Sequence, residues 1–225
     1  LYEQTNNNIK AIDEYLKVID HEGTHEDVYI RLSNLYLKED AIPSAVEVLE
    51  RARKSGFDTT NVKEMLSDLY LKNGNPEKAF DITTDELTKV KCLLDMDKKD
   101  EAIQKLNQME DQYSHIAQFH SLKAQYYYMT GDYNKALECV AKFDELEKNS
   151  PLTYQMRALI YEEKNDDYNA HINWGKYNLV RGNKDIAINE YLNAYQLKND
   201  DLELLNTLAT VSYTHLRAHE TRSNL

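Results

Sequence analysis

The sequence predicts an all-α protein, an α-solenoid of antiparallel helix pairs, and three observations lead to this fold class. The chain has 225 residues but only 6 Gly and 3 Pro. An all-β domain of this length would need many more turn residues, so helices joined by short polar loops are favoured. Tyrosine is unusually frequent, with 17 residues against 4 Phe and 1 Trp. Several residue types also recur at intervals of 34 positions, which indicates an internal repeat.

The repeat appears as four columns of residues that keep the same interval. The tyrosine column is Tyr2, Tyr36, Tyr70, Tyr127 and Tyr161. The alanine column is Ala11, Ala45, Ala79, Ala102, Ala136 and Ala170. Small residues stand three positions before the tyrosine, at Ser33, Ser67, Ala124 and Ala158. Glycines stand four positions after it, at Gly74 and Gly131. Independent columns with one period are a much stronger signal than any single short motif.

Each column has a physical role in a helix-turn-helix unit. The small residue lets the second helix approach the first closely, and the tyrosine fills the space beside it while its hydroxyl reaches a partner. The first helix ends at a glycine, or at a polar pair such as Glu39-Asp40 or Asn165-Asp166, where the helix C-cap requires a residue in the left-handed conformation. The alanine then begins the contact of the second helix, and apolar residues follow it at steps of three and four.

These columns resemble the tetratricopeptide repeats, which have a 34-residue period with a small residue at position 8, Tyr at 11, Gly near 15 and Ala at 20. Residues 131–137 and 182–188 are the segments most similar to that family. The resemblance covers residues 1–211 and implies a single right-handed superhelix of about six repeats. Leu1-Tyr2 already stands at position 11, so we interpret the chain as a fragment that opens within a repeat.

Two steps of the alanine column depart from the period. Eleven residues are missing between Ala79 and Ala102, so residues 76–96 must form one long helix or two short ones. Thr83 and Glu86 have the spacing of a capping box, which favours a break near Thr83. The second short step, of 17 residues, leads from Ala170 to Ala187. There residues 168–181 are predicted to form one helix that serves both neighbouring repeats.

The C-terminal segment does not follow the pattern. From Ser212 the periodicity is lost, and we interpret residues 212–225 as a non-native tail that packs loosely.

Charge and composition exclude several classes of function. The chain has 27 Lys+Arg against 39 Asp+Glu, a net charge of -12, which argues against binding to nucleic acids or to anionic membranes. No stretch has the roughly 18 apolar residues of a membrane helix. Cys92 and Cys139 are expected to be buried free thiols. With no signal pattern, these thiols favour the cytoplasm.

One motif could carry chemistry, at His21-Glu22-Gly23-Thr24-His25. It matches the H-E-x-x-H pattern of zinc peptidases, which need both histidines on one helix face and the glutamate as base. Gly23 would break that helix, and the segment lies between two repeats, so we expect a solvated loop. A zinc peptidase is kept as a hypothesis that metal analysis can test.

The other candidate ligands are isolated or incomplete. His215 and His219 lie in the proposed tail, and His120 and His171 are expected to have packing roles. The cluster Asp95, Asp97 and Asp100 lacks the glycine and terminal glutamate of a calcium loop, so we expect a capped helix junction. No phosphate-binding loop or nucleophile elbow is present. We therefore predict no catalytic residue, no metal site and no cofactor, and a chain that is not an enzyme.

A surface is the remaining candidate site. The resemblance implies that positions 2, 5, 9, 12 and 13 of each first helix line a concave groove. The groove residues carried over are Asn34, Leu37, Lys38, Asp68, Leu71, Lys72, Gln125, Tyr128, Met129, Gln155, Leu159 and Glu162. This mixture of polar and apolar side chains suits an extended peptide or a partner helix. The alternative is that these positions are merely tolerated at a solvated surface.

The resemblance also allows one sub-family to be tested. Repeats that clamp the acidic C-termini of chaperones use Lys and Asn at positions 5 and 9. Here only Asn34 fits, and Glu64 and Asp68 would repel a carboxylate, so binding of an acidic chaperone tail is disfavoured. The leading hypothesis is a non-enzymatic scaffold that binds a protein or peptide. The alternative is a regulatory or substrate-recognition region of a larger enzyme, which a catalytic domain in the full-length gene would support.

Overall fold

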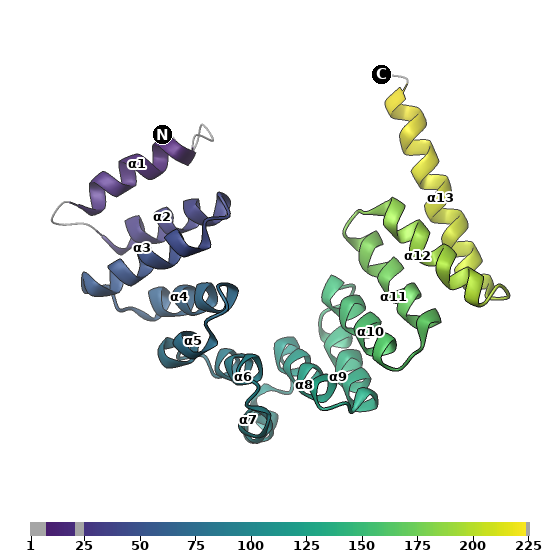
Figure 1. Cartoon of the computed structure of the whole chain (residues 1–225), viewed down its shortest axis with the longest axis horizontal. Coiled ribbons are helices and arrows are strands. Elements are labelled where there is room, and N and C mark those ends of the chain that lie inside the picture. The colour runs from purple at the N-terminus through teal and green to yellow at the C-terminus, as the bar shows by residue number, and fades with distance from the viewer. Residues whose placement is uncertain (1–7, 21–24, 224–225) are drawn as a thin grey trace. The chain divides into compact units, whose positions relative to one another are not determined.

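The computed structural model describes the backbone of residues 8–20 and 25–223, and side chains up to residue 213. Over these ranges it contains helices and no strand (Figure 1). The helices are α1 (Asn8–Ile19), α2 (Glu26–Lys38), α3 (Ile42–Lys54), α4 (Thr60–Lys72), α5 (Pro76–Ile82), α6 (Glu86–Asp95), α7 (Lys99–Tyr113), α8 (Ala117–Met129), α9 (Tyr133–Leu146), α10 (Pro151–Glu163), α11 (Asp167–Val180), α12 (Lys184–Leu197) and α13 (Leu202–Ser223). The predicted all-α repeat fold is confirmed.

The helices form two compact units, residues 1–105 and 106–225, whose boundary falls within α7. In unit 1, α1 contacts α2, and the antiparallel pairs α2–α3 and α4–α5 follow one another. In unit 2, α8 pairs with α9, α10 with α11, and α12 contacts both α11 and α13. Each unit is thus a stack of helix hairpins in which most helices bury one face against the next.

The small-residue and alanine columns meet where two helices of a hairpin touch. Ser33, Ser67, Ala124 and Ala158 are at most 1% exposed, and the alanine column is buried throughout. The Oγ of Ser33 donates to the carbonyl of Ala45 at 3.4 Å, and Ser67 makes the same bond to Ala79 at 3.4 Å. A serine therefore keeps the close approach of an alanine while its hydroxyl is satisfied on the partner helix.

The turn after each first helix has one backbone conformation. The φ angle is positive at Asp40, Gly74, Asp97, Gly131, Asn165 and Gly182, with values between 56° and 81°. In each turn this residue donates to a carbonyl three residues earlier, as in Gly131 to Tyr128 at 3.1 Å. The residue after it donates to a carbonyl five residues earlier, as in Asp132 to Tyr127 at 2.9 Å. This C-cap explains why Gly, Asn or Asp occupies the position.

The tyrosine column lies beside these contacts. Tyr70 is 6% exposed, and its hydroxyl donates to Glu50 Oε1 at 2.6 Å. Burial, and then the nearby Glu50 carboxylate, raise the pKa of Tyr70 to about 12. Tyr36, Tyr127 and Tyr161 are partly buried, so their burial is less complete than at Tyr70. Tyr2 lies outside the described residues.

The first departure from the period is a pair of short helices. The predicted break is confirmed, because α5 ends at Ile82 and α6 begins at Glu86. The predicted capping box is wrong, because the N-cap is Asp85, whose Oδ2 accepts from the amide of Thr88 at 2.7 Å. The Thr83 hydroxyl instead donates to Glu64 Oε2 at 2.5 Å. Thr83 is therefore engaged with α4.

Glu64 holds this junction from α4. Its Oε1 accepts from the amide of Thr84 at 2.8 Å and from the Thr84 hydroxyl at 2.7 Å. Partial burial opposes ionisation of this carboxyl group, but the hydrogen bonds from Thr83 and Thr84 outweigh it and hold the pKa of Glu64 below 4.5. The break in the repeat is thus fastened by an ionised side chain.

The second departure is a shared helix. The segment between Asn165 and Gly182 is the single helix α11, which packs on α10 and on α12. This confirms the prediction that one helix serves both neighbours. A Cβ at Gly175 would lie 2.5 Å from Cε1 of Tyr191, whose side chain is 1% exposed. Gly175 therefore lets the Tyr191 ring lie directly on the backbone of α11.

The C-terminal helix extends into the proposed tail. Helix α13 continues to Ser223, and Tyr213 on it is 64% exposed. Most side chains of the proposed tail lie outside the described residues.

Cys92 and Cys139 are buried free thiols, as predicted, and burial raises the pKa of both, that of Cys92 to about 11. No helix in the described ranges is long and apolar enough to cross a bilayer.

Candidate functional site

The predicted groove positions of unit 1 lie on α2 and α4. Their polar members are exposed, namely Asn34, Lys38, Asp68 and Lys72. Leu37 and Leu71 are partly buried and pack against the hydrophobic core of the unit. No hydrogen bond or ion pair within the described part of the chain involves the four polar side chains. On this face of unit 1, four polar side chains are therefore available to bind a ligand, next to two leucines that are packed into the core.

Glu64 does not act as the groove residue that position 5 implies. Its carboxylate is occupied by Thr83 and Thr84 at the α5–α6 junction. Of the two carboxylates expected to repel an acidic ligand, only Asp68 is exposed. The other carboxylate, Glu64, therefore stabilises the α5–α6 junction and is not available to a ligand.

The predicted groove positions of unit 2 lie on α8 and α10 and are more enclosed. The partly buried members are Gln125, Tyr128, Met129, Gln155 and Leu159. Glu162 is exposed. The ring of Tyr128 packs against the core cluster that contains Ala124 and Val140. These side chains are anchored at their bases, so the surface has a defined shape.

Two of these residues belong to a larger group that we call the aromatic–acidic surface, defined by Tyr128, Tyr133, Glu162, Glu163, Trp174 and Tyr177. Glu163 lies between two phenols, since the hydroxyls of Tyr128 and Tyr133 donate to its Oε1 and Oε2, both at 3.4 Å. Trp174 Nε1 donates to Glu162 Oε1 at 2.7 Å. Adjacent carboxylates at the end of α10 thus connect aromatic rings from α8, α9 and α11.

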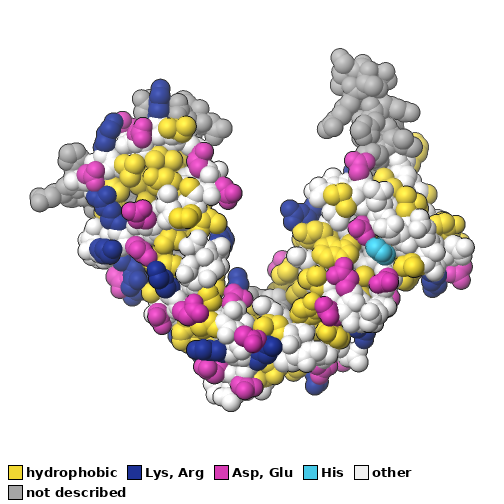
Figure 2. Space-filling model, viewed as in Figure 1, with side chains coloured by type: hydrophobic (Ala, Val, Ile, Leu, Met, Phe, Trp, Pro, Cys, Tyr) yellow, Lys and Arg dark blue, Asp and Glu magenta, His cyan; other side chains and the backbone are white. Residues whose placement is uncertain are grey.

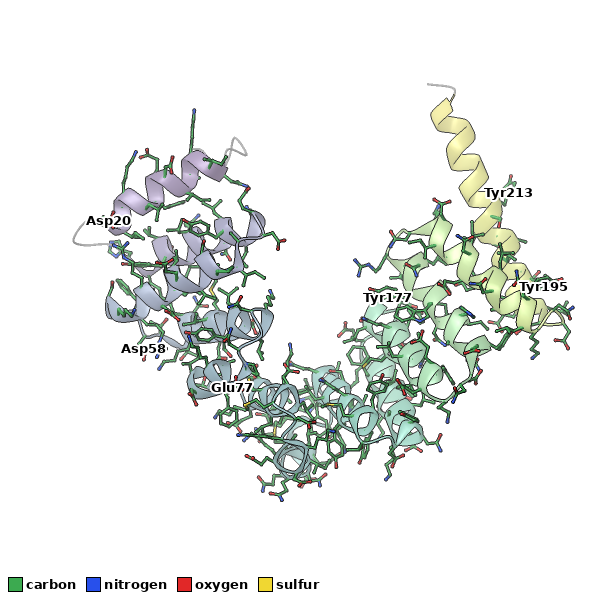
Figure 3. All side chains as sticks on the ribbon, in the orientation of Figure 1. Asp20, Asp58, Glu77, Tyr177, Tyr195 and Tyr213 are labelled. Atoms are coloured by element: carbon green, nitrogen blue, oxygen red, sulfur yellow. The ribbon has the colours of Figure 1, made fainter. Side chains whose placement is uncertain are left out.

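The rings themselves lie in two pairs. Tyr128 and Tyr133 have centroids 6.1 Å apart, and Trp174 meets Tyr177 edge to face at 5.4 Å. Tyr177 lies on the opposite side of unit 2 from Tyr195 and Tyr213 (Figure 3). Figure 2 shows hydrophobic side chains beside carboxylates over α10, α11 and α12. The face of unit 2 that this view shows is therefore mixed apolar and acidic.

The electrostatics of the surface are those of carboxylates close to phenols. Desolvation, followed by the charge of Glu163, raises the pKa of Tyr128 and of Tyr133, so both stay protonated donors. Two cations on α10 and α11 or just after them bond to groups other than Glu162 and Glu163. Lys164 Nζ donates to Asn134 Oδ1 at 2.7 Å, and Arg181 Nη1 donates to the Tyr177 hydroxyl at 2.6 Å.

Sequence reasoning predicted Tyr128 and Glu162 but missed the other four members. Tyr133, Trp174 and Tyr177 do not stand at the inward positions of the repeat, whereas Glu163 stands at inward position 13 but was not among the predicted groove residues. A signal was present: Tyr128 and Tyr133 flank the turn at Gly131, and Trp174 is the single tryptophan. Which helix their side chains reach depends on packing that the period does not specify.

Two of the isolated histidines, His120 and His171, contact polar groups of the chain. His120 is 4% exposed, and its Nε2 is 2.7 Å from the carbonyl of Ser114, which confirms a packing role. His171 is partly buried with Nδ1 2.7 Å from Glu190 Oε2. His215 and His219 lie outside the described side chains.

The candidate metal ligands are not brought together within the described residues. Of the H-E-x-x-H motif, residues 21–24 lie outside the described residues, and His25 is the exposed residue before α2. Asp97 pairs with Lys99 at 3.0 Å in the turn between α6 and α7, where a helix junction was expected. No group of three candidate ligands that could hold a metal occurs in the described parts of the chain.

Solved structures share this fold. A tetratricopeptide repeat protein from Parabacteroides merdae aligns with a TM-score of 0.61 at 13% identity and covers 94% of each chain. The Cut9–Hcn1 hetero-tetramer of the APC/C gives a TM-score of 0.57 at 10% identity over 93% of this chain and 47% of that chain. The C-terminal part of a TPR repeat-containing protein from Cytophaga hutchinsonii gives 0.51 at 18% identity, covering 92% and 96%. No family model and no curated protein matches the sequence.

Proposed function

We propose that this chain, which has the tetratricopeptide-repeat fold, is a non-catalytic interaction module that binds a protein partner. The partner presents an extended peptide or a helix to the groove face of either unit, formed by α2 and α4 in unit 1 and by α8 and α10 in unit 2. The groove residues are the twelve predicted ones: Asn34, Leu37, Lys38, Asp68, Leu71, Lys72, Gln125, Tyr128, Met129, Gln155, Leu159 and Glu162.

The observation that supports this proposal most is the state of the groove side chains. On α8 and α10, apolar groups such as Leu159 and Met129 are partly exposed next to amides, although both helices bury other faces in the core. Partly exposed apolar groups beside hydrogen-bonding amides suit a peptide, which offers side chains and an unpaired backbone together. A net charge of -12 disfavours nucleic acid as the partner.

The proposal is tested with peptides selected on the chain from a random displayed library. Binding of a selected peptide is measured by fluorescence anisotropy for the parent chain and for Gln125→Ala, Gln155→Ala and Asn34→Ala. We expect at least one groove variant to weaken binding tenfold or more, because interface energy concentrates in a few residues. Glu138→Ala, on the exposed face of α9, is the matched control and should leave the affinity unchanged.

Two outcomes would contradict the proposal. If no selected peptide binds the folded chain, the module has no peptide-binding function. If Glu138→Ala weakens binding and the groove variants do not, the interacting face lies on the second helices instead.

A further inference from the structure

We propose that the aromatic–acidic surface of unit 2 is the anchor point for a lysine or arginine side chain of the partner peptide. This inference rests on the proposed function and specifies the chemistry of its ligand. It follows from three properties of the surface: two carboxylates without an ion-pair partner, three partly exposed aromatic rings with no cation over them, and the ends of two helices.

The first property is the absence of a cationic partner for the two carboxylates. Some carboxylates elsewhere in the chain pair with cations, as Glu110 does with Lys123 at 2.5 Å and Asp144 with Arg157 at 3.2 Å, whereas Glu162 and Glu163 are exposed side chains. Among the ion pairs of the described residues, none includes Glu162 or Glu163. Their bonds come from neutral donors, a tryptophan N–H and two phenols, which leave the negative charge in place.

The second property is the lack of a cation over three of the four rings, those of Tyr128, Tyr133 and Trp174. This chain repeatedly places a cation over an aromatic ring, as with Lys78 over Tyr70 at 5.2 Å and Lys135 over Tyr127 at 5.3 Å. In the surface itself, Arg181 lies over the ring of Tyr177 at 5.3 Å, but within the described residues no cation lies over Tyr128, Tyr133 or Trp174. A tryptophan or tyrosine face attracts lysine and arginine, and a neighbouring carboxylate strengthens that attraction.

The third property is the position of the surface at helix ends. Tyr128 is the last residue but one of α8, and Glu162 and Glu163 end α10. The C-terminus of a helix carries partial negative charge from carbonyls without helical partners, so both helices favour a cation here. Lys164 bonds to Asn134, and Arg181 lies within the surface but bonds to the Tyr177 hydroxyl rather than to Glu162 or Glu163.

Charge complementarity selects the occupant. A peptide with one lysine or arginine can place its charge between Glu162 and Glu163 while its aliphatic stem covers an aromatic ring. An acidic peptide would be repelled. A second copy of the chain is also disfavoured, because each copy has a net charge of -12.

The test uses Trp174 as a reporter, because it is the only tryptophan in the chain and lies within the surface. The emission of the chain is titrated with octalysine, and separately with octaglutamate, at physiological salt. We expect octalysine to change the emission of Trp174 with saturation, and octaglutamate to leave it unchanged.

Two matched variants distinguish octalysine binding at this surface from nonspecific electrostatic attraction to an acidic chain. E162Q/E163Q removes two negative charges but keeps amide oxygens that accept from Trp174 and the tyrosines, so the fold should persist. E145Q/E147Q removes two charges from exposed positions at the end of α9. We expect the octalysine Kd to rise at least tenfold in the first variant and less than twofold in the second. Equal loss in both variants, or no emission change in the parent chain, would overturn the proposal.

The library-selected peptides distinguish this inference from the function on which it rests. If those peptides bind the groove but lack lysine and arginine, and tolerate E162Q/E163Q, the cation anchor is wrong and the interaction module stands. If they carry a basic residue whose replacement by norleucine or citrulline lowers affinity as E162Q/E163Q does, the anchor is supported. Failure of every peptide to bind contradicts both.

Discussion

The two interruptions of the repeat, one in each unit, are built in different ways. In unit 1 the step between Ala79 and Ala102 is eleven residues short, and the chain breaks into the short helices α5 and α6. In unit 2 the step from Ala170 to Ala187 is 17 residues, and the chain does not break, because α11 serves two neighbours. Hydrogen bonds to Glu64 hold the first interruption, whereas the fit of Tyr191 against Gly175 holds the second.

What the two interruptions share is the turn that follows the first helix. Asp97 before α7 and Gly182 before α12 both have positive φ and the backbone bonds of the regular repeats. This turn and the alanine contact therefore define the repeat, while the second helix can be shortened, as in α5, or shared, as in α11. The difference between the two interruptions also implies that unit 1 is sensitive to charge at its interruption and unit 2 to side-chain size.

The largest expected effect is loss of a buried tyrosine in each unit, Tyr70 in unit 1 and Tyr191 in unit 2. Tyr70→Ala and Tyr191→Ala should each lower the free energy of unfolding by about 3–5 kcal/mol, because each leaves a large cavity at a helix contact. Urea denaturation with circular dichroism measures the change. Tyr213→Ala is the control and should cost less than about 0.5 kcal/mol, since this side chain is 64% exposed. A cost near the control value at Tyr191 would mean that α12 does not depend on this contact.

The next largest change in stability is expected when a single methyl group is added to the shared helix α11. Gly175→Ala should destabilise the chain by about 1–3 kcal/mol, because the new Cβ would lie 2.5 Å from Cε1 of Tyr191, a ring that is 1% exposed. Alanine is otherwise the better helix former by about 1 kcal/mol, so the sign tests the contact directly. Adding Tyr191→Leu to Gly175→Ala should recover part of the loss in a double-mutant cycle. Stabilisation by Gly175→Ala alone would contradict the packing described for α11.

The interruption of unit 1 should respond to pH instead. Glu64→Gln should cost about 1–2 kcal/mol at neutral pH, because the hydrogen bonds from Thr83 and Thr84 then lose their charged acceptor. The pKa of Glu64 is lowered by folding, so its contribution is present above its unfolded value of 4.5 and is lost as pH falls through the folded value. The difference between parent and variant, measured by urea denaturation from pH 7 to pH 3, should therefore shrink below about pH 4.5. A constant difference across this range would exclude the ionised carboxylate as its source.

The smallest effects compare one hydroxyl in each unit. Tyr70→Phe should destabilise unit 1 by about 1 kcal/mol, because it removes the bond to Glu50. Tyr191→Phe should be neutral or stabilising by about 1 kcal/mol, because the Tyr191 hydroxyl is buried without a hydrogen-bond partner among the described residues. Thermal denaturation of both variants measures the sign. If both substitutions destabilise, a bound water satisfies Tyr191.

The fold followed from the sequence wherever one residue column determines one contact. Ser33 and Ala45 could be paired because helix geometry allows only a small residue where two backbones approach. The shared helix α11 could be predicted because Ala170 and Ala187 leave room for one helix between them. The N-cap at Asp85 could not be predicted, because Thr83 and Asp85 are both good capping residues. The choice between them depends on Glu64, which is distant in sequence.

The candidate site was less accessible to the same reasoning. Repeat positions pointed to Tyr128 and Glu162, but Trp174 reaches Glu162 across two helices of a hairpin. Such a contact depends on the length and rotamer of a side chain, which no periodic pattern encodes. The polar groove residues of α2 and α4 were identified by position alone, and their role stays a prediction.

The positions of the two cysteines make the chain a reporter of its own local opening. Cys92 lies in unit 1 and Cys139 in unit 2, both buried, and the chain has no other thiol. A thiol-specific reagent can therefore modify either site only when the surrounding helices separate. Mass spectrometry after pulse labelling would time the opening of each half separately in the unaltered protein, without introducing a probe. It would also reveal whether ligand binding protects one half before the other.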